Sequence, residues 1–404
     1  MAVTPATTSL RVAVVHNRYQ QPGGEDQVFE REAALLQDAG HEVLRYEVHN
    51  DAIDSSSAVG VAARTVWNAT TYRVLRHVFA DFRPDVVHVH NTLPLVSASV
   101  FAAARRAGAA VIQTLHNYRM ICPSATLFRN DRPCELCVSQ PLALSGIRHA
   151  CYRNSRAATA VVAGTTFIHR ALGTYIRNVD RFIALTDFAR AKLIAGGIPP
   201  WQLVVKPNFT EPATQHRVQG GDAALFVGRL TEEKGVRTLL EAWRRHPSLL
   251  PLRIAGDGAL KNMADTLAAS SHHNVKVLGA LPGHAIRTEM RGARLLVFPS
   301  VCYEGFPVTI AEAFSVGLPV VASRIGSIPE IVLDNAVGLT FTAGNADELA
   351  ECVHRLTVDP QLNLALSRGA LEQYENRYTP EANLKQLLSI YRDAMEHRPV
   401  RSSR

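Results

Sequence analysis

The sequence has few aromatic residues and no long uncharged apolar run. Phe, Trp and Tyr make up 7% of its 404 residues, while 47% are hydrophobic and 20% are charged, the composition of an ordinary globular protein. The longest uncharged apolar stretch, 157–168, is shorter than the roughly 18 to 20 residues that cross a bilayer. The first residues also lack the basic and then apolar pattern of a secretory signal peptide. We therefore expect a cytoplasmic protein without a membrane-spanning helix.

Acidic residues are scarce in the first half of the chain. Residues 1–205 carry 21 Lys and Arg against 15 Asp and Glu, a net charge of +6, and the remainder carries 22 against 21, which together give the +7 of the whole chain. A basic first half is typical of proteins that meet an acidic partner, such as an anionic membrane surface or a phosphorylated acceptor. A solvated Arg-rich face is the alternative. Nucleic acid is not an expected partner, because the bases are scattered and no recognition motif accompanies them.

Only six cysteines are present, and four of them lie between Cys122 and Cys151 in the spacing C-x11-C-x2-C-x13-C. Without a secretion signal, metal binding explains this cluster better than disulfides. Cys134 and Cys137 have the spacing of half a zinc knuckle, and the outer two cysteines could complete a tetrahedral site, with His149 as a spare ligand. We expect a Cys-rich insertion that holds a structural zinc ion, with reduced thiols or redox activity as the alternatives.

Short runs of β-branched and aliphatic residues alternate with longer amphipathic stretches along the chain. This alternation predicts parallel sheets with crossover helices. Two series of runs are separated by the polar, turn-rich segment 206–222, so we expect two doubly wound units, 1–206 and 207–378. The predicted strands of the first unit are Val12–Val15, Val86–Val89, Val111–Leu115 and Phe182–Leu185; those of the second are Leu225–Val227, Leu252–Ala255, Val275–Leu278, Leu295–Phe298 and Pro319–Ala322.

The last segment, 379–396, is predicted to be a helix with a strong apolar face. It opens with a Thr cap and Pro380 at the first helical position. Its apolar stripe runs from Leu384 to Tyr391.

Three segments that follow predicted strands carry residues suited to an anionic ligand, since open parallel sheets bind ligands at the carboxyl ends of their strands. Gly23 and Gly24, just before a helix expected from about Glu25, would let the backbone and the helix dipole approach a phosphate. Arg229 and Lys234, five apart around a turn, could converge on one diphosphate. A structural Gly-Gly turn and a solvated basic turn are the alternatives for these two segments.

The third segment, CYEGFPVTIAEAF at 302–314, holds two carboxylates near a helix N-terminus. We expect a helix from about Thr309, with Glu312 in its first turn and Glu304 in the loop before it. The N–H groups and dipole of a helix N-terminus favour an anion. Two acids beside such a site suggest that the anion is only the middle of the ligand, with hydroxyl-bearing groups on either side.

In combination these motifs carry a family resemblance. GGED after the first strand, GRLTEEKG opening the second unit, AGDG at 255–258, and EGFPVTIAEA followed by GLPVVAS resemble the retaining nucleotide-sugar glycosyltransferases of family 4. The resemblance covers nearly the whole chain in the right order. It implies the GT-B fold, in which two Rossmann-like domains face each other across a cleft and the last helix crosses back to the acceptor-side first domain.

The resemblance also implies roles for individual residues. Glu312 would bind the ribose hydroxyls of the donor, Glu304 would lie beside the donor sugar, and Arg229 and Lys234 would hold the diphosphate and neutralise the departing nucleoside diphosphate. His116, in TLHNYR, matches a histidine that the family places beside the donor sugar. The remaining expected donor contacts are Gly23, Gly24, Gly305, Phe306, Val308 and Thr309. His90, in VHVHN, is a second candidate, although a histidine at a strand end is often only a satisfied polar contact.

The implied activity is retaining transfer from a nucleoside-diphosphate sugar to a hydroxyl of a glycan or lipid-linked acceptor, in cell-surface polysaccharide or glycolipid biosynthesis. The chain has no D-x-D motif, so no metal cofactor is expected for catalysis. Pro307, where many relatives have Gly, cannot donate a backbone N–H and makes the donor sugar harder to infer. The alternatives are a sugar-nucleotide 2-epimerase and a catalytically idle nucleotide-sugar-binding protein of the same fold.

A location at the inner face of the membrane is a further expectation. The basic segment Arg64–Arg83 has aromatic and aliphatic residues at helical spacing and could rest on an anionic membrane. Packing of its apolar face into the core is the alternative.

Overall fold

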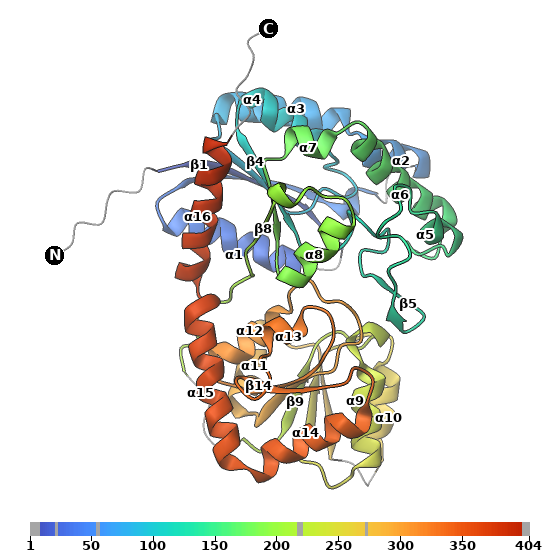
Figure 1. Cartoon of the computed structure of the whole chain (residues 1–404), viewed down its shortest axis with the longest axis vertical. Coiled ribbons are helices and arrows are strands. Elements are labelled where there is room, and N and C mark those ends of the chain that lie inside the picture. The colour runs from blue at the N-terminus through green and yellow to red at the C-terminus, as the bar shows by residue number, and fades with distance from the viewer. Residues whose placement is uncertain (1–8, 21–22, 54–56, 216–220, 271–273, 398–404) are drawn as a thin grey trace, which may run out of the picture.

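The computed structural model describes residues 9–20, 23–53, 57–215, 221–270 and 274–397, and it contains two six-stranded sheets (Figure 1). The first has the order β2-β1-β3-β4-β7-β8, and all of its strand pairs are parallel. Alternate residues of β1 face opposite sides: Val12 and Val14 lie in one buried cluster and Ala13 and Val15 in another. The sheet is therefore buried on both faces, as in a doubly wound fold. Its strands are β1 (Arg11–Arg18), β2 (Glu42–His49), β3 (Val86–Val89), β4 (Ala110–Leu115), β7 (Arg181–Ala184) and β8 (Leu203–Val205).

The second sheet, with the order β11-β10-β9-β12-β13-β14, is also entirely parallel. Its strands are β9 (Ala224–Val227), β10 (Leu252–Ala255), β11 (Val275–Gly279), β12 (Leu295–Phe298), β13 (Val320–Ser323) and β14 (Gly338–Phe341). A small antiparallel pair, β5 (Phe128–Arg129) and β6 (Arg132–Pro133), lies in the Cys-rich segment of the first domain.

Helices cover both sheets. Those of the first domain are α1 (Gly24–Asp38), α2 (Ala58–Val66), α3 (Ala69–Phe82), α4 (Ser99–Ala107), α5 (Leu144–Arg148), α6 (Arg156–Ala171), α7 (Thr174–Asn178) and α8 (Asp187–Ala195). Those of the second domain are α9 (Val236–Arg245), α10 (Lys261–Ala269), α11 (Gly283–Gly292), α12 (Val308–Ser315), α13 (Ile328–Ile331) and α14 (Ala346–Val358). Single 3-10 turns cover Asn50–Ile53, Pro200–Gln202 and Glu232–Lys234.

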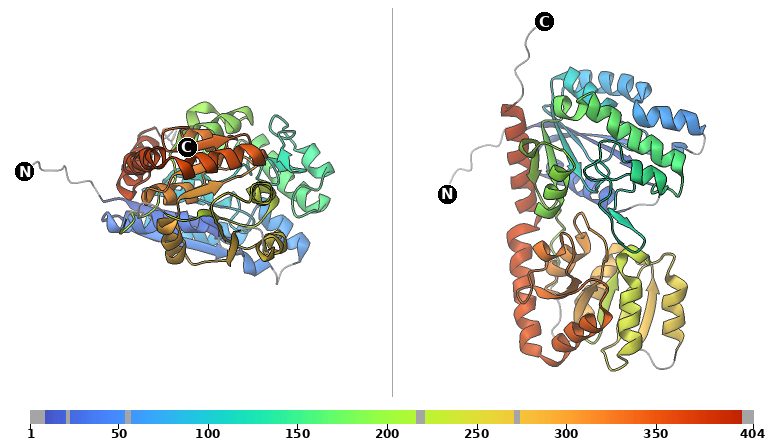
Figure 2. Two further views of the ribbon diagram at one scale, coloured as in Figure 1. Left: turned by 90° about the horizontal axis from the view of Figure 1, so that it is seen from below. Right: turned by 45° about the vertical axis from the view of Figure 1, so that its right-hand side comes forward.

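The last two helices join the domains along one side. α15 (Pro360–Arg377) packs on the second domain and α16 (Pro380–Glu396) on the first, so that together they form one column (Figure 2). The hydroxyl of Thr379 accepts the N–H of Ala382 and caps α16. Leu387 and Tyr391 are fully buried against the first sheet. Burying side chains of this size contributes about 2 kcal/mol each, which fixes α16 on the first domain.

The predicted fold class, two Rossmann-like α/β domains, is confirmed. Three strands of the two six-stranded sheets were not predicted: β2, whose EVLRYEVH carries charges at an edge of the sheet, and the short β8 and β14. The small pair β5 and β6 was not predicted either. The domain limits at 206/207 and 378/379 stay predictions, and residues 216–220 of the expected linker lie outside the described residues. Within Arg64–Arg83 the apolar stripe of α3 is core, because Leu75 and Phe79 are fully buried.

Candidate donor site in the interdomain cleft

Lys234 and Glu304 form the central polar contact of the candidate site. The Lys234 ammonium donates to both carboxylate oxygens of Glu304, at 2.8 and 3.0 Å, and the hydroxyl of Ser300 donates to Glu304 Oε1 at 2.8 Å. Burial opposes the charged form of Lys234, but the Glu304 carboxylate outweighs it and the pKa of Lys234 is raised. Lys234 therefore stays charged and places a fixed positive charge at the carboxyl ends of β9 and β12.

A glycine makes this geometry possible. Gly235 follows Lys234 with φ +70°, and a Cβ there would lie 1.8 Å from the carbonyl oxygen of Pro299. Only glycine allows the turn to pack this closely on the end of β12. Arg229 lies in the preceding loop with its side chain 71% exposed and contacts Glu233 at 3.3 Å. Its guanidinium is thus held only by a weak surface contact.

Glu312 lies one residue further along its helix than predicted. The helix α12 begins at Val308, so its first turn contains no acid and Glu312 lies beyond that turn. The expectation of a helix from Thr309 with Glu312 in the first turn was therefore wrong by one residue. The Glu312 carboxylate pairs with Arg31 on α1 of the other domain at 3.1 Å.

The loop before α12 touches the first domain directly. A Cβ on Gly305 would lie 2.5 Å from the carbonyl oxygen of His116, and the hydroxyl of Tyr118 donates to the carbonyl of Glu304 at 3.2 Å. The side chain of Phe306 points instead into the second-domain core, where its ring lies 5.4 Å from that of Tyr378. Phe306 can contact a ligand in the cleft only through its backbone. Val308 and Thr309 form the first turn of α12 and are partly exposed.

His116 and His90 stack on each other and share a hydrogen bond. His90 Nδ1 lies 2.9 Å from His116 Nε2, and the ring centroids are 5.2 Å apart. Burial, together with His16, His88 and Lys206, keeps the pKa of His116 well below its usual value. Both rings are therefore neutral near pH 7. Both histidines line one small cavity of the first domain, in which His116 is partly exposed and His90 is buried.

Behind His90 lies a fully buried ionic cluster that the sequence did not indicate. Glu32 on α1 accepts a 2.5 Å hydrogen bond from Lys206, and its other oxygen lies 3.4 Å from His90 and 3.8 Å from His88. His88 also contacts the hydroxyl of Tyr391 on α16 at 2.8 Å. The cluster ties α1, β3, the segment after β8 and α16 together. It already contains the Lys206 ammonium, so it does not resemble a cation site.

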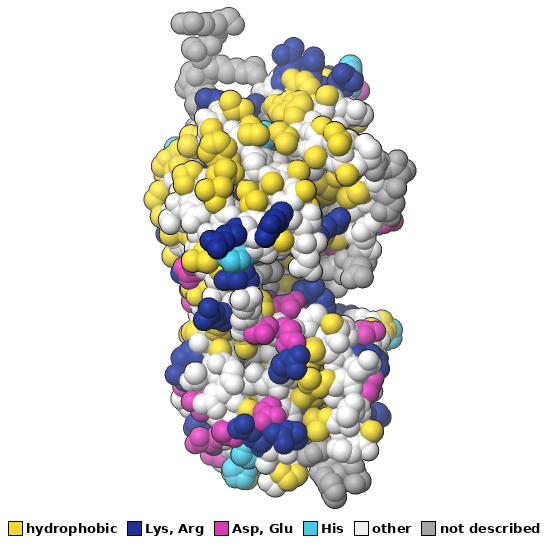
Figure 3. Space-filling view, turned by 90° about the vertical axis from the view of Figure 1, so that its right-hand side faces the viewer, with side chains coloured by type: hydrophobic (Ala, Val, Ile, Leu, Met, Phe, Trp, Pro, Cys, Tyr) yellow, Lys and Arg dark blue, Asp and Glu magenta, His cyan; other side chains and the backbone are white. Residues whose placement is uncertain are grey.

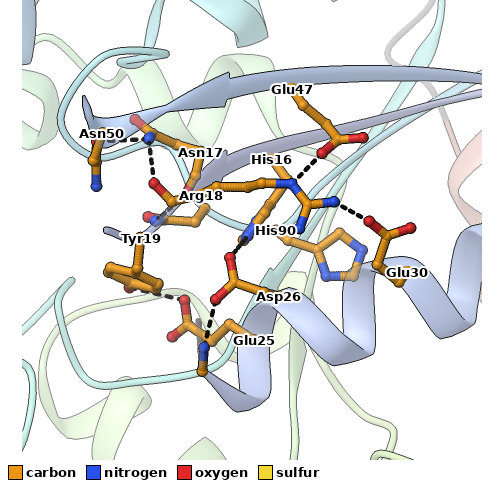
Figure 4. Close-up of polar contacts among 12 residues, drawn as sticks. His16, Asn17, Arg18, Tyr19, Glu25, Asp26, Glu30, Glu47, Asn50 and His90 are labelled. Atoms are coloured by element: carbon orange, nitrogen blue, oxygen red, sulfur yellow. Dashed lines mark hydrogen bonds and ion pairs between the residues drawn. The ribbon is translucent and has the colours of Figure 1, made fainter. Parts of the chain in front are cut away.

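The loop between β1 and α1 is built around the two residues after the paired glycines (Figure 4). Gly23 is the N-cap of α1, and its N–H donates to Asp26 at 2.7 Å, while Asp26 also contacts His16 at 2.9 Å. Burial raises the pKa of Glu25, although hydrogen bonds from Tyr19 and Asn117 oppose the shift. A Cβ added to Gly24 would meet nothing within 4 Å outside its own chain neighbours and helix backbone.

Two further contacts between the domains were not predicted from the sequence. Glu330 of α13 accepts the N–H groups of Asp187 and Phe188 at the start of α8, at 2.9 and 2.6 Å. Tyr303, next to Glu304, donates its hydroxyl to Glu135 at 2.9 Å, and Glu135 accepts two hydrogen bonds from Lys192. These pairs join residues far apart in the chain, and no local pattern could have revealed them.

The four clustered cysteines, Cys122, Cys134, Cys137 and Cys151, lie in one region of the first domain. All four are free thiols. Among the residues that the structure describes, no three of their sulfur atoms come within 4.8 Å of one another. The zinc site stays a prediction.

Comparisons with known protein families identify both halves of the chain. Residues 221–359 match the family described as "Glycosyl transferases group 1", and residues 23–208 match the "Glycosyl transferase 4-like domain". The two matches together span most of the chain and divide it as the two sheets do.

Several curated proteins are similar in sequence. A phosphatidyl-myo-inositol mannosyltransferase of Mycolicibacterium smegmatis is 23% identical over 92% of this chain and 91% of its own length. An uncharacterised glycosyltransferase of Methanocaldococcus jannaschii is 30% identical over 51% of this chain, and an amylovoran biosynthesis glycosyltransferase of Erwinia amylovora is 30% identical over 49%. The chain spans only about half the length of these last two relatives, 55% and 53%.

Solved structures show the same fold at low sequence identity. A sucrose-phosphate synthase from Thermosynechococcus elongatus gives a TM-score of 0.70 with 16% identity, covering 95% of this chain and 99% of that one. Anabaena HepE, solved in complex with UDP, gives 0.67 with 16% identity, covering 94% and 99%. With two Rossmann-like domains and matches to the family in both of them, this chain belongs to the group 1 glycosyltransferases, also called family 4, of the GT-B fold.

Proposed function

We propose that the protein transfers a sugar from a nucleoside-diphosphate donor to a hydroxyl of a glycan or lipid-linked acceptor, with retention of anomeric configuration. The observation that carries the proposal is the contact of the charged Lys234 with Glu304, which lies before α12 with Arg229 near it and His116 across the cleft. A diphosphate placed against Lys234, Arg229 and the first turn of α12 would meet three sources of positive charge. That charge would stabilise the departing nucleoside diphosphate, and no metal ion is needed in this scheme.

The hydrogen bonds of Glu304 favour attack from the same face that the diphosphate leaves. A double displacement needs a nucleophilic carboxylate with an oxygen free to attack. Oε1 of Glu304 accepts from Lys234 and Ser300, and Oε2 accepts from Lys234. Glu304 is therefore better suited to orient the sugar and Lys234 than to form a covalent intermediate. In this scheme a phosphate oxygen of the leaving group receives the proton of the acceptor hydroxyl.

The roles of the remaining residues follow the same geometry. Glu312 would bind the ribose, and the backbone of Gly305, Phe306 and the first turn of α12 would contact the phosphates and the sugar. Gly23 and Gly24 would approach the donor from the first domain, with His116 beside the sugar. Names such as amylovoran biosynthesis glycosyltransferase and phosphatidyl-myo-inositol mannosyltransferase among the relatives support a role in cell-surface polysaccharide or glycolipid synthesis.

The test is a panel of sugar nucleotides, with binding measured by thermal shift and turnover measured with and without acceptor. Stabilisation by one nucleoside diphosphate, with product whose linkage retains the donor configuration, is the expected result. Formation of a 2-epimer from the donor alone would refute transfer, and failure of every nucleotide to bind would favour an idle protein. Turnover that persists with chelator present supports the metal-independent scheme.

A further inference from the structure

Most of the large exposed hydrophobic side chains of the described residues lie on one side of the first domain. Among the described residues, only three large exposed hydrophobic side chains belong to the second domain, Met263, Leu333 and Val358. In the first domain, α2, α5 and α7 all pack against α6. These four helices and the turns beside them carry most of the remaining exposed hydrophobic side chains. We call these residues the apolar face: Val59, Trp67, Leu136, Leu144, Phe167, Ile168, Leu172 and Ile176.

Several of these side chains are too exposed to be explained as core packing. Val59 is 80% exposed, Leu144 61%, Leu172 56% and Ile176 52%. Figure 3 shows hydrophobic side chains gathered over the upper domain, with Lys and Arg among them, whereas the lower domain presents a mixed charged surface. Contiguous exposed apolar surface of this kind marks a site of interaction with a membrane or with another molecule.

The charge of the same segments is of one sign. Residues 136–179 contain no Asp or Glu and carry Arg148, Arg153, Arg156, Arg170 and Arg177. Residues 55–80 contain no acid either and carry Arg64, Arg73 and Arg76. A surface that combines exposed Leu, Ile, Phe and Trp with arginines, in segments that contain no acid, is complementary to an anionic lipid headgroup layer over acyl chains.

The position of α6 connects this face to the candidate reaction site. Phe167 and Ile168 are exposed on its outer side, while Thr165 and Thr166 line a cavity of about 50 Å³ that also contains His116. Tyr175 of α7 lines the same cavity. A membrane lying against α6 would therefore be separated from His116 by one helix, a distance that suits an acceptor anchored in that membrane.

From these observations we infer that the apolar face docks on an anionic phospholipid membrane and presents the cavity beside His116 to a lipid-linked acceptor. The membrane docking is inferred only from the composition and position of the apolar face. The choice of a lipid-linked acceptor rests on the proposed function. Among the described residues, no helix is both long and apolar enough to cross a bilayer. The inference keeps Trp67 from the segment Arg64–Arg83, where the sequence placed the membrane-facing surface, but not the apolar stripe of α3, which faces the core. Half of the apolar face comes from α6, α7 and the turn between them.

The experiment is co-sedimentation of the full chain with vesicles of phosphatidylcholine alone and of phosphatidylcholine mixed with phosphatidylglycerol. We expect binding to the mixed vesicles, weaker binding to the neutral ones, and loss of binding as salt is raised. The double variant L172S/I176S should lower the partition coefficient about tenfold or more, because it removes two of the most exposed apolar side chains. The matched control L333S/V358S changes equally exposed side chains on the second domain and should bind as the unchanged protein does.

Three results would overturn the inference: no sedimentation with mixed vesicles, equal binding by L172S/I176S, or a dimer in solution that L172S/I176S converts to a monomer. The last result would make the face an interface between copies of the chain. Nucleotide binding measured on the same preparations separates this inference from the proposed function. A protein that binds vesicles but no nucleotide would refute the function and leave the docking surface intact.

Discussion

Arg31 and Glu312 form an ion pair that joins the two domains across the cleft, with Nη2 of Arg31 3.1 Å from Oε1 of Glu312. Both side chains are mostly buried, at 19% and 17% exposure. The carboxylate that is proposed to bind the ribose thus already has a partner from the opposite domain. A nucleotide that uses both oxygens of Glu312 must displace Arg31 or share the carboxylate with it.

Replacing Arg31 with Met should therefore tighten the binding of the nucleoside diphosphate. A partly exposed ion pair contributes about 1 kcal/mol, so the expected gain is about fivefold in Kd, measured by titration calorimetry. The control is R45M, which removes an arginine that pairs with Glu30 on the outer side of α1. Weaker binding by R31M would contradict the prediction and would show that Arg31, whose buried Nη1 has no described hydrogen-bond partner, itself contacts the nucleotide.

The Lys234–Glu304 pair should be essential for turnover. K234M removes the fixed charge that stabilises the leaving diphosphate, and we expect kcat to fall by about 100- to 1000-fold while the protein remains folded. The matched control is R237M, because Arg237 pairs with Glu232 on the exposed side of the same segment. The double variant K234M/E304Q should unfold at a higher temperature than K234M, since K234M alone leaves a mostly buried carboxylate unpaired. Near-normal turnover by K234M would refute the assignment.

Gly305 should be required for the domains to close. A Cβ in G305A would lie 2.5 Å from the carbonyl oxygen of His116, a contact with rigid backbone that can be relieved only if the loop moves or the domains separate. We expect a raised KM for the donor, a larger radius of gyration by small-angle scattering and an unchanged circular dichroism spectrum. G283A is the control, because nothing lies within 4 Å of the Cβ that it adds. Unchanged kinetics in G305A would mean that this contact plays no part in closure.

The local chemistry of the site was predictable from the sequence, but its pairings were not. Buried parallel strands and glycine-punctuated loops predict where Lys234, Glu304 and Gly305 lie, because each follows a strand of the same sheet. Glu312, Glu304 and Tyr303 contact Arg31, Tyr118 and Glu135, respectively. These three partners belong to the first domain, so the contacts depend on how the two domains close. The strand β2 was missed for a related reason: as an edge strand it carries Glu42, Arg45 and Glu47 and lacks a continuous apolar run.

Lowering the pH should destabilise the protein through His88. Burial first of all, with Lys206 adding to the effect and Glu32 opposing it, lowers the pKa of His88 from 6.5 to about 4. Between these values the unfolded chain binds a proton that the folded chain does not. The free energy of unfolding therefore falls as the pH drops through this window, by up to about 3 kcal/mol.

Urea unfolding of the unchanged protein and of H88Q at pH 7 and pH 4.5 measures this contribution. The difference in unfolding free energy between the two pH values should be smaller in H88Q, whose side chain does not titrate. His90, the neighbour with a similarly lowered pKa, remains in both proteins. The control H354Q removes an exposed histidine and should leave the pH dependence as it is. An equal pH dependence in H88Q would show that His88 is already protonated in the folded protein.

The zinc prediction has support from the backbone of the Cys-rich segment. Ala125, Leu127 and Ala150 adopt positive φ, at 68°, 48° and 50°, although none is a glycine. Each such residue costs about 1 kcal/mol or more and persists only where the surroundings hold it. Cys137 and Ala143 of this segment also lie in a small buried hydrophobic cluster, together with Ala163 of α6. An ion held by four thiolates would add a constraint to the backbone hydrogen bonds of this segment.

Atomic emission analysis of protein purified without chelator should therefore find one zinc per chain. The pair C134S/C137S should lose the metal and unfold at a lower temperature, whereas C352S, a buried cysteine of the second domain, should keep it. Among the described residues, no three of the cysteine Sγ atoms lie within 4.8 Å of one another, so zinc binding must draw them together. Glu135 lies between Cys134 and Cys137 in the sequence and would move with them. Metal removal should consequently loosen the contact between Glu135 and Tyr303 and raise the donor KM more than it lowers kcat. A purified protein with no metal and six titratable thiols would refute the site and leave reduced cysteines as the explanation.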